Sequence, residues 1–366
     1  MKKVGILSMQ RIRNYGSFLQ AYGLKKILEG IGCDVEFVDY HVDEPIVKDA
    51  AKEKNIFEKG IETLNGNAKL WHKFQYIIYK QNFSKNFKYL ELPKEYNYCP
   101  KLNTLVIGSD EVFNLIQSNK NVGYSLELLG KDNRADRVIT YAASFGNTTI
   151  EKINKYEKKD EISNLLKNID SISVRDKNSY EIVKKLTEIN PQINLDPVLI
   201  FDYMNSELVP QIRTKEKYII IYAYNNRINK EEALEIKKIA NKKGYKIYSI
   251  GGTQPYADKF IDCTPFEVLA YFKNAEFIIT DTFHGSIFSI ICNKQFVTIV
   301  RKSEGNKYGN EEKLTFLLEN LNLKSRIVYD YKKIEKVISE KINFEKTNEI
   351  ISEERKKTMK YLKENI

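Results

Sequence analysis

The stretch VGILSMQRIRNYGSFLQAYGLKKILEGIGCDVEFVDY, residues 4–40, decides the fold class. It opens with a short apolar run, Val4 to Ser8, of the kind that forms a buried parallel strand. After a loop with Asn14-Tyr15-Gly16, an amphipathic helix begins at Ser17 and ends at Gly30 and Gly32, and VEFVDY follows as a second strand. Because parallel strands need a crossover helix, this order predicts a βαβ unit at the start of an α/β sheet.

The rest of the chain continues the alternation of strand-like and helical segments in two series. The strand-like runs are LVIGSD (105–110), VITYAASFG (138–146) and SISVRD (171–176) in the first series, and YIIIYAY (218–224), YKIYSIGG (245–252), FIITDTFHG (277–285) and FVTIV (296–300) in the second. Helices are predicted between them, including one near 157–168 and one over SIFSIICN (286–293).

The length of 366 residues favours two domains rather than one. We expect an N-terminal α/β domain over 1–205, with a Lys- and aromatic-rich helical insertion at 43–100. A C-terminal α/β domain is expected over 206–345, and a helix at 346–366 that packs back on the first domain. The insertion suits contact with an acceptor, a membrane or a second subunit, and the residues give no basis for choosing among them. The oligomeric state is not readable from the sequence.

The composition suits a chain with real hydrophobic cores and a solvated surface, because 42% of residues are hydrophobic and 30% are charged. No apolar run reaches the roughly 18 residues of a membrane span, and the start MKKVGILSMQ is too short a run for a signal peptide. We therefore expect a cytoplasmic protein.

The formal net charge is +10, but its lysines are spread along helices with interleaved glutamates. Solvated helix faces explain this pattern, so we expect no nucleic-acid partner, while peripheral attachment to an anionic membrane face remains compatible with it. The cysteines Cys33, Cys99, Cys263 and Cys292 are scattered without CxxC spacing, which predicts buried free thiols and no metal site.

Candidate site residues follow the strand-like runs, because ligands of open α/β sheets bind beyond the carboxyl ends of the strands. Nucleotide-binding glycine patterns, GxGxxG after the first strand and GxxxxGK[ST] anywhere, do not occur. The candidates are Asn14, Tyr15, Gly16, Ser109, Asp110, Glu111, Ser144, Arg175, Gly251, Gly252, Asp281, Thr282, His284, Gly285, Arg301 and Lys302.

His284 is the strongest single candidate, because it stands at a strand-to-helix turn, where it can act as a general acid toward a bound anion. Asp281 either orients His284 or caps the helix. Arg175, beside Asp176, suits a bidentate clamp for a phosphate or carboxylate or else a local ion pair. Arg301 and Lys302 follow the next strand and are expected to reach the same cleft.

Asp110 and Glu111 are adjacent carboxylates that suit a metal, sugar hydroxyls or a helix cap. Gly251 and Gly252 offer close backbone approach to a ligand or form a plain turn. The pair Asp196-Pro197 reads as structural.

The ordered set of motifs resembles the polysaccharide pyruvyl transferase family, and the resemblance runs from Met1 to about Arg326. The motifs that carry it are NYGSFLQAYGL (14–24), VIGSDEVFN (106–114), YAASFG (141–146), SVRD (173–176), LDPVLIF (195–201) and ITDTFHGSIFSIICNKQFV (279–297).

That resemblance implies two Rossmann-like domains facing across a cleft, similar to glycosyltransferases of the B type. It also implies transfer of pyruvate from phosphoenolpyruvate, the donor substrate, onto two hydroxyls of a sugar or lipid-linked oligosaccharide, giving a cyclic ketal in exopolysaccharide or capsule synthesis. No cofactor and no metal are implied. Carried onto this chain, the resemblance makes His284 the catalytic acid and Arg175 the cation that binds the donor. From the chemistry of the reaction, we expect Arg301 to join Arg175 in holding the donor's charge and Asp110 or Asp281 to activate the hydroxyl.

One position departs from the family pattern, which places an arginine two residues before the histidine. Here that residue is Thr282, so Arg301, Lys302 or Lys307 would have to supply the cation. Two alternatives therefore stay open: a glycosyltransferase with a nucleotide-sugar donor, since fold does not set function, and a non-catalytic binding protein of a polysaccharide assembly pathway.

Overall fold

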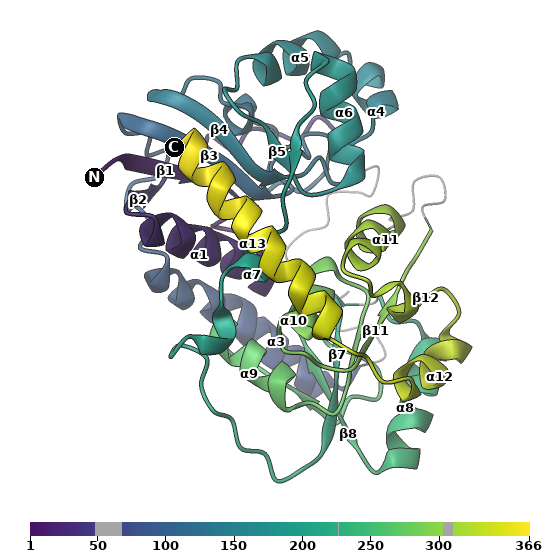
Figure 1. The fold of residues 1–366 in the computed structure, drawn as a ribbon. Helices are drawn as coiled ribbons and strands as arrows, with labels where there is room; N and C mark the ends of the chain where they lie inside the picture. Colours follow the sequence, from purple (N-terminus) through teal and green to yellow (C-terminus); the bar gives the residue numbers. More distant parts are fainter. Residues whose placement is uncertain (48–67, 226, 303–309) are drawn as a thin grey trace.

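The computed structural model describes residues 1–47, 68–225, 227–302 and 310–366 (Figure 1). It contains two six-stranded sheets whose strands pair in parallel, which confirms the predicted α/β class. In spatial order the first sheet consists of β2 (Asp34–Phe37), β1 (Lys3–Leu7), β3 (Leu102–Asp110), β4 (Ala135–Ala143), β5 (Ser173–Val174) and β6 (Gln192–Ile193). The second consists of β12 (Ile327–Val328), β11 (Phe296–Ile299), β10 (Ile278–Thr280), β7 (Tyr218–Tyr222), β8 (Lys246–Ile250) and β9 (Lys259–Phe260).

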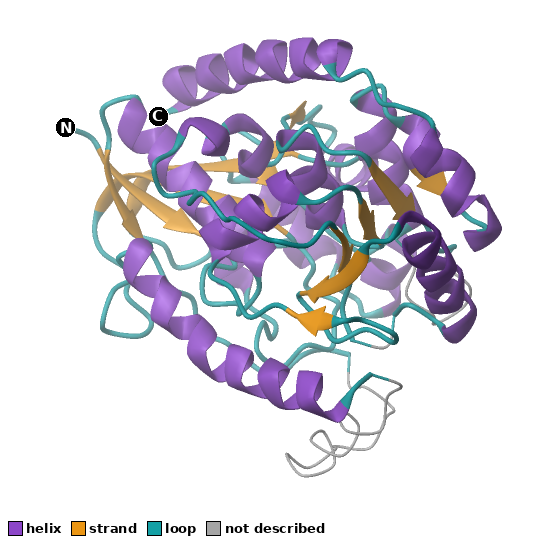
Figure 2. Cartoon of the chain, turned by 90° about the horizontal axis from the view of Figure 1, so that it is seen from below, coloured by secondary structure: helices purple, strands orange, loops and turns teal. Residues whose placement is uncertain are grey.

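Helices lie on both sides of the strands, so the sheets are enclosed (Figure 2). Those of the first half are α1 (Tyr15–Gly30), α3 (Leu70–Asn82), α4 (Ile150–Lys155), α5 (Lys159–Lys167), α6 (Lys177–Thr187) and α7 (Pro197–Ile200), with a 3₁₀ helix η1 (Phe83–Tyr89). Those of the second are α8 (Lys230–Lys243), α9 (Pro265–Asn274), α10 (Phe283–Ile291), α11 (Glu311–Asn320), α12 (Ile334–Ser339) and α13 (Glu345–Asn365).

Side-chain caps begin the helices that border the interior of the molecule. The Asn14 side chain accepts a hydrogen bond from the backbone N–H of Ser17 and so starts α1. Thr282 caps α10 in the same way by accepting from the N–H of Gly285. Because of this cap, α10 begins at Phe283, three residues earlier than the sequence pattern predicts.

The core joins the two halves of the molecule. One cluster of buried apolar residues runs from β1 through α1 and α7 to α9 and α10. Across this contact the hydroxyl of Tyr15 donates to the carbonyl of Cys263 at 2.9 Å, and the Tyr15 and Tyr222 rings lie 6.3 Å apart. Helix α13 runs across both halves (Figure 1). Its Tyr361 hydroxyl donates to the carbonyl of Thr140 in β4 at 2.8 Å.

Two local predictions need correction. The helix predicted near 157–168 is two short helices, α4 and α5, because Glu157 between them takes a φ of +55°. The second strand ends at Phe37 rather than Tyr40, where Asp39 turns to bind Arg11 at 2.7 Å. Within the insertion, α3 and η1 confirm the predicted helices, while 48–67 lies outside the described residues.

Candidate active site

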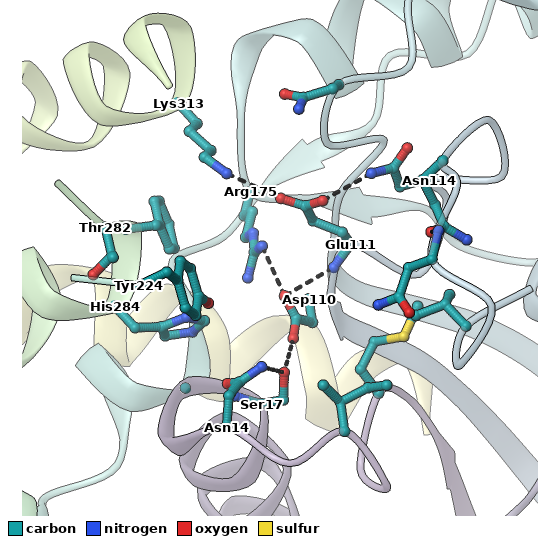
Figure 3. A pocket seen from close by; sticks show the side chains of 18 of the residues that line it. Asn14, Ser17, Asp110, Glu111, Asn114, Arg175, Tyr224, Thr282, His284 and Lys313 are labelled. Carbon is teal, nitrogen blue, oxygen red and sulfur yellow. Dashed lines mark hydrogen bonds and ion pairs between the residues drawn. The ribbon is translucent and has the colours of Figure 1, made fainter. Parts of the chain in front are cut away.

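A cavity of about 530 Å³ is lined by side chains from both halves of the molecule (Figure 3). It lies at the carboxyl ends of the strands, as the topology of open α/β sheets requires. The predicted residues that line it are Asn14, Gly16, Asp110, Glu111, Arg175, Thr282 and His284.

Asp110 is the centre of the first-half wall. Its carboxylate accepts from the Ser17 hydroxyl at 2.7 Å and from Arg175 Nη2 at 3.1 Å (Figure 3). Burial by itself raises the pKa of Asp110, but Arg175, His284 and Ser17 outweigh that effect and hold the pKa below its usual value. The residue also adopts a φ of +77°, a conformation that costs a non-glycine residue about 1–3 kcal/mol and is concentrated at functional sites.

Arg175 is held between two carboxylates rather than standing as an unpaired clamp. Its Nη1 donates to Asp196 at 2.7 Å while Nη2 donates to Asp110, and the guanidinium lies 4.7 Å above the Phe283 ring. The side chain is buried, so these contacts place the guanidinium plane in one orientation. A guanidinium has five N–H donors, so a ligand in the cavity can share it.

His284 lies in the first turn of α10, opposite Asp110 and Arg175. Its Nε2 is 3.4 Å from Asp196 Oδ2, and its Nδ1 packs over Gly16, where an added Cβ would stand only 2.2 Å away. Burial alone raises the pKa of Asp196, but His284 and Arg175 reverse the shift and keep that pKa below its usual value. Asp196 therefore stays ionised and orients the imidazole ring, while it also caps α7 through the N–H of Val198.

A second ion pair closes the cavity between the halves. Lys313 of α11 donates to Glu111 at 3.0 Å, and Glu111 also accepts from Asn114 at 2.8 Å (Figure 3). Burial favours the neutral acid, but Lys313 overcomes this and lowers the pKa of Glu111. The two carboxylates next to each other in sequence thus pair with different cations.

Asp281 has neither role that the sequence suggested. Thr282 caps α10, and the carboxylate facing His284 is Asp196. Asp281 is completely buried, with Oδ2 at 3.7 Å from Arg301 and 3.9 Å from Arg227. Burial raises its pKa in spite of these two cations.

Arg301 and Lys302 were expected to reach the cleft, and neither lines the cavity. Arg301 instead binds Glu232 of α8 with two 2.9 Å hydrogen bonds, because the strand end directs it toward α8. The third proposed replacement for the family's arginine, Lys307, lies outside the described residues. Thr282 lines the cavity, but it contributes an uncharged helix cap.

The remaining candidates support the structure around the cavity without lining it. The Tyr15 hydroxyl donates a hydrogen bond to the Cys263 carbonyl, the Ser109 hydroxyl donates to the Ala142 carbonyl, and the Ser144 hydroxyl donates to the Asp176 carboxylate. Gly251 and Gly252 form the turn after β8, and Gly285 packs so closely that a Cβ would stand 2.2 Å from Thr280 Oγ1.

Sequence reasoning missed Tyr224, Arg227 and Lys313 as cavity residues. It did not select Ser17 from the segment after the first strand, and it gave Asp196 only a structural role. Tyr224 and Arg227 follow β7, so the rule of strand carboxyl ends, applied to this strand as to the others, would have found them. Lys313 gives no such signal, because it lies inside a charged helical segment. Asp196, for which the sequence predicts a structural role, does cap α7, and it also contacts His284 and Arg175.

The described residues contain no group of three or more His, Cys, Asp or Glu side chains placed to hold a metal ion. All four cysteines are free thiols, of which Cys263 and Cys292 are buried and Cys33 and Cys99 only partly so. Within the described ranges, no helix has both the length and the apolar character needed to span a bilayer.

Comparison with solved structures supports the fold. S. aureus MnaA in its complex with UDP has a TM-score of 0.51 at 10% identity, with 96% of this chain and 91% of that chain covered. UDP-GlcNAc 2-epimerase from Methanocaldococcus jannaschii follows with a TM-score of 0.49 at 11% identity, covering 94% and 93%. The likeness to MnaA confirms the predicted arrangement of two facing α/β domains, similar to glycosyltransferases of the B type.

Sequence comparison identifies the family. Among curated proteins, none matches the chain significantly. The sequence profile of the family described as polysaccharide pyruvyl transferase matches residues 14–303, a range that contains the cavity-lining residues Asn14, Asp110, Arg175 and His284. This chain therefore belongs to the polysaccharide pyruvyl transferase family.

Proposed function

We propose that this protein transfers pyruvate from phosphoenolpyruvate onto two hydroxyls of a sugar, forming a cyclic ketal in the synthesis of a bacterial cell-surface polysaccharide such as a capsule or exopolysaccharide. The observation that carries the proposal is that Asp196 pairs with both Arg175 and His284 at the wall of a cavity that side chains from both halves of the molecule line. Arg175 in turn binds Asp110. The acceptor is a sugar or a lipid-linked oligosaccharide, and a lipid-linked one would bring the reaction to the inner face of the cytoplasmic membrane.

The donor is a small, highly charged anion and needs several positive groups. Arg175, Arg227 and Lys313 all line the cavity, and they approach it from three different elements. The first turn of α10 adds the positive end of its helix dipole. In this proposal Arg227 and Lys313 take the part that an arginine at the position of Thr282 has in the family pattern.

His284 supplies the proton that the donor's methylene carbon must receive. In the protonated ring, Asp196 holds Nε2–H, which leaves Nδ1–H as the acid beside Gly16. Protonation of the methylene carbon makes the neighbouring C2 electrophilic. The first sugar hydroxyl adds there, and the second then displaces inorganic phosphate to close the ketal, so that each hydroxyl loses one proton.

Asp110 is placed to accept a hydrogen bond from the attacking hydroxyl. Its lowered pKa makes it a weak base, so it orients the hydroxyl and stabilises the positive charge that develops at C2. His284, once it has given its proton to the donor, can accept the proton of a hydroxyl. This scheme needs no metal and no organic cofactor.

A nucleotide-sugar donor is the second candidate, and one observation favours it. Thr282 leaves the family's cation position uncharged, while Asp110 and Glu111 already pair with Arg175 and Lys313. A donor of lower charge density than phosphoenolpyruvate needs fewer cations.

Thermal-shift titration separates the two donors, because a ligand that binds only the folded state raises the melting temperature. We expect phosphoenolpyruvate to raise it and a panel of nucleotide sugars to leave it unchanged. In the presence of acceptor, His284→Ala should lower turnover about 100- to 10,000-fold, while His41→Ala, at an exposed ion pair with Glu127, should not. A shift with a nucleotide sugar alone would replace pyruvyl transfer by glycosyl transfer.

A further inference from the structure

Helix α3 exposes a continuous row of large apolar side chains to solvent. Leu70, Trp71, Phe74 and Ile78 are 58%, 68%, 49% and 49% exposed. Because successive residues of an α-helix are separated by about 100°, these positions fall within one arc of about 100° on the helix. We call this row the α3 face. Contiguous exposed apolar patches of this kind mark interaction sites in proteins.

The opposite side of α3 is anchored in the core, so the α3 face has a defined orientation. His72 and Tyr79 are buried, and the Tyr79 ring lies 5.5 Å from Tyr15 and 6.0 Å from Phe260. Those two contacts tie α3 to α1 in the first half and to β9 in the second. The exposure of Trp71 and Phe74 is therefore a feature of a packed helix rather than of a frayed end.

Within α3 and η1 the charged side chains have a single sign, while Asp258, just before β9, lies near His72 on the opposite side of α3. Between residues 68 and 90 the sequence contains five lysines and no aspartate or glutamate. Lys69, Lys85 and Lys88 are exposed at the two ends of the helical segment. A second copy of this chain would bring the same positive segment and a net charge of +10 against it, so like charges oppose self-association through this face.

We propose that the α3 face docks the protein on the surface of a bilayer that contains anionic phospholipid. A helix with Trp, Phe and Leu on one side and lysines around it lies in the interface plane, with its apolar row among the acyl chains and its lysines at the headgroups. Each lysine near an anionic membrane surface adds attraction that salt weakens.

The C-terminal end of α3 lies next to the cavity. Lys80, near the end of α3, donates to the carbonyl of Arg13 at 2.8 Å, and the next residue, Asn14, lines the cavity. A membrane contact near the cavity would serve a lipid-linked acceptor, and this benefit rests on the proposed function. The docking itself needs neither donor nor acceptor, so its test is independent of the reaction.

Trp71 is the single tryptophan of the chain and therefore reports on the α3 face without a label. The experiment titrates the full-length protein with vesicles of 30% phosphatidylglycerol in phosphatidylcholine, and with phosphatidylcholine alone. We expect the emission of Trp71 to shift to shorter wavelength only with the anionic vesicles, and brominated acyl chains to quench it. Raising the salt to about 0.5 M should weaken binding at least 10-fold, because the Debye length then falls to a few Å.

Phe74→Glu/Ile78→Glu keeps Trp71 as the reporter and should weaken vesicle binding at least 10-fold. The control Leu208→Glu/Leu234→Glu places the same charges at exposed leucines elsewhere and should bind like the parent protein. Circular dichroism and melting temperature verify that both variants fold. Unchanged Trp71 emission with anionic vesicles, or equal binding by both variants, would overturn the proposal. A concentration-dependent dimer that dissociates only in Phe74→Glu/Ile78→Glu, with no response to lipid, would also overturn it and assign the α3 face to a second copy.

Discussion

Gly16→Ala tests the placement of the candidate acid without changing any polar group. A Cβ at Gly16 would stand 2.2 Å from Nδ1, 2.4 Å from Cγ and 2.8 Å from Cε1 of His284. An ordinary contact is 3.4 Å or more, so the ring must retreat by about 1 Å or rotate away. Misplacing a catalytic group by about 1 Å costs roughly 100-fold in rate, and we expect turnover to fall by that factor.

The same substitution should leave the fold in place. Gly16 lies in the first turn of α1 and its φ is not positive, so alanine introduces no backbone strain there. Overpacking costs about 1–3 kcal/mol, and the better helix propensity of alanine returns up to about 1 kcal/mol. For a chain of this size, the melting temperature should change by less than about 5 °C.

Gly30→Ala, at the other end of the same helix, is the matched control because a Cβ there meets nothing within 4 Å. Turnover is measured as phosphate release from phosphoenolpyruvate with acceptor. The NMR signals of the three histidines give a second readout that needs no acceptor. Only Gly16→Ala should shift the His284 signal. If Gly16→Ala and Gly30→Ala match each other in both readouts, the packing of His284 over Gly16 does not set its function.

Asp196→Asn should lower the free energy of unfolding by about 3 kcal/mol at pH 7, since it breaks a buried charge pair. The pKa of Asp196 is lower in the folded state than in the unfolded state, so its ionisation stabilises the fold at neutral pH and this contribution is lost as pH falls below about 4. In urea titrations, the stability of the variant should therefore fall less steeply below about pH 4 than that of the parent protein. An equally steep fall would contradict this. Lys313→Met removes the partner of Glu111 and should weaken phosphoenolpyruvate binding about 10-fold in thermal-shift titration, and an unchanged midpoint would exclude Lys313 from the donor site. Glu312 is an exposed residue of α11 whose Oε1 accepts from the backbone N–H of Asn178 in α6, and partial loss of hydration and nearby Asp176 raise its pKa to about 7. The parent protein should therefore lose stability as pH rises from about 4.5 to 7, and Glu312→Gln should lose less; parallel curves would show that Glu312 does not titrate there.

The sequence was a good guide to the fold because each signal is local. Val4 to Leu7 form a buried apolar run, Asn14 caps the helix that follows, and the same strand–helix alternation recurs through both halves. Such patterns depend on neighbours within one element, so they can be read before any packing is known. The rule that ligands meet strand carboxyl ends likewise brought Asp110, Arg175 and His284 together in advance.

The ion pairs of the cavity depended on tertiary structure. Lys313 meets Glu111, and His284 meets Asp196, across distances in sequence that no local pattern spans. The direction of a side chain mattered as much as its position in the sequence. Arg301 follows the expected strand, but its guanidinium pairs with Glu232 of α8. The amino-acid sequence by itself determined the elements, their order and the edge at which the site forms, because periodicity and caps are local. Only the tertiary structure decided which charges face the cavity and which neutralise one another, because those contacts form when the two halves pack together.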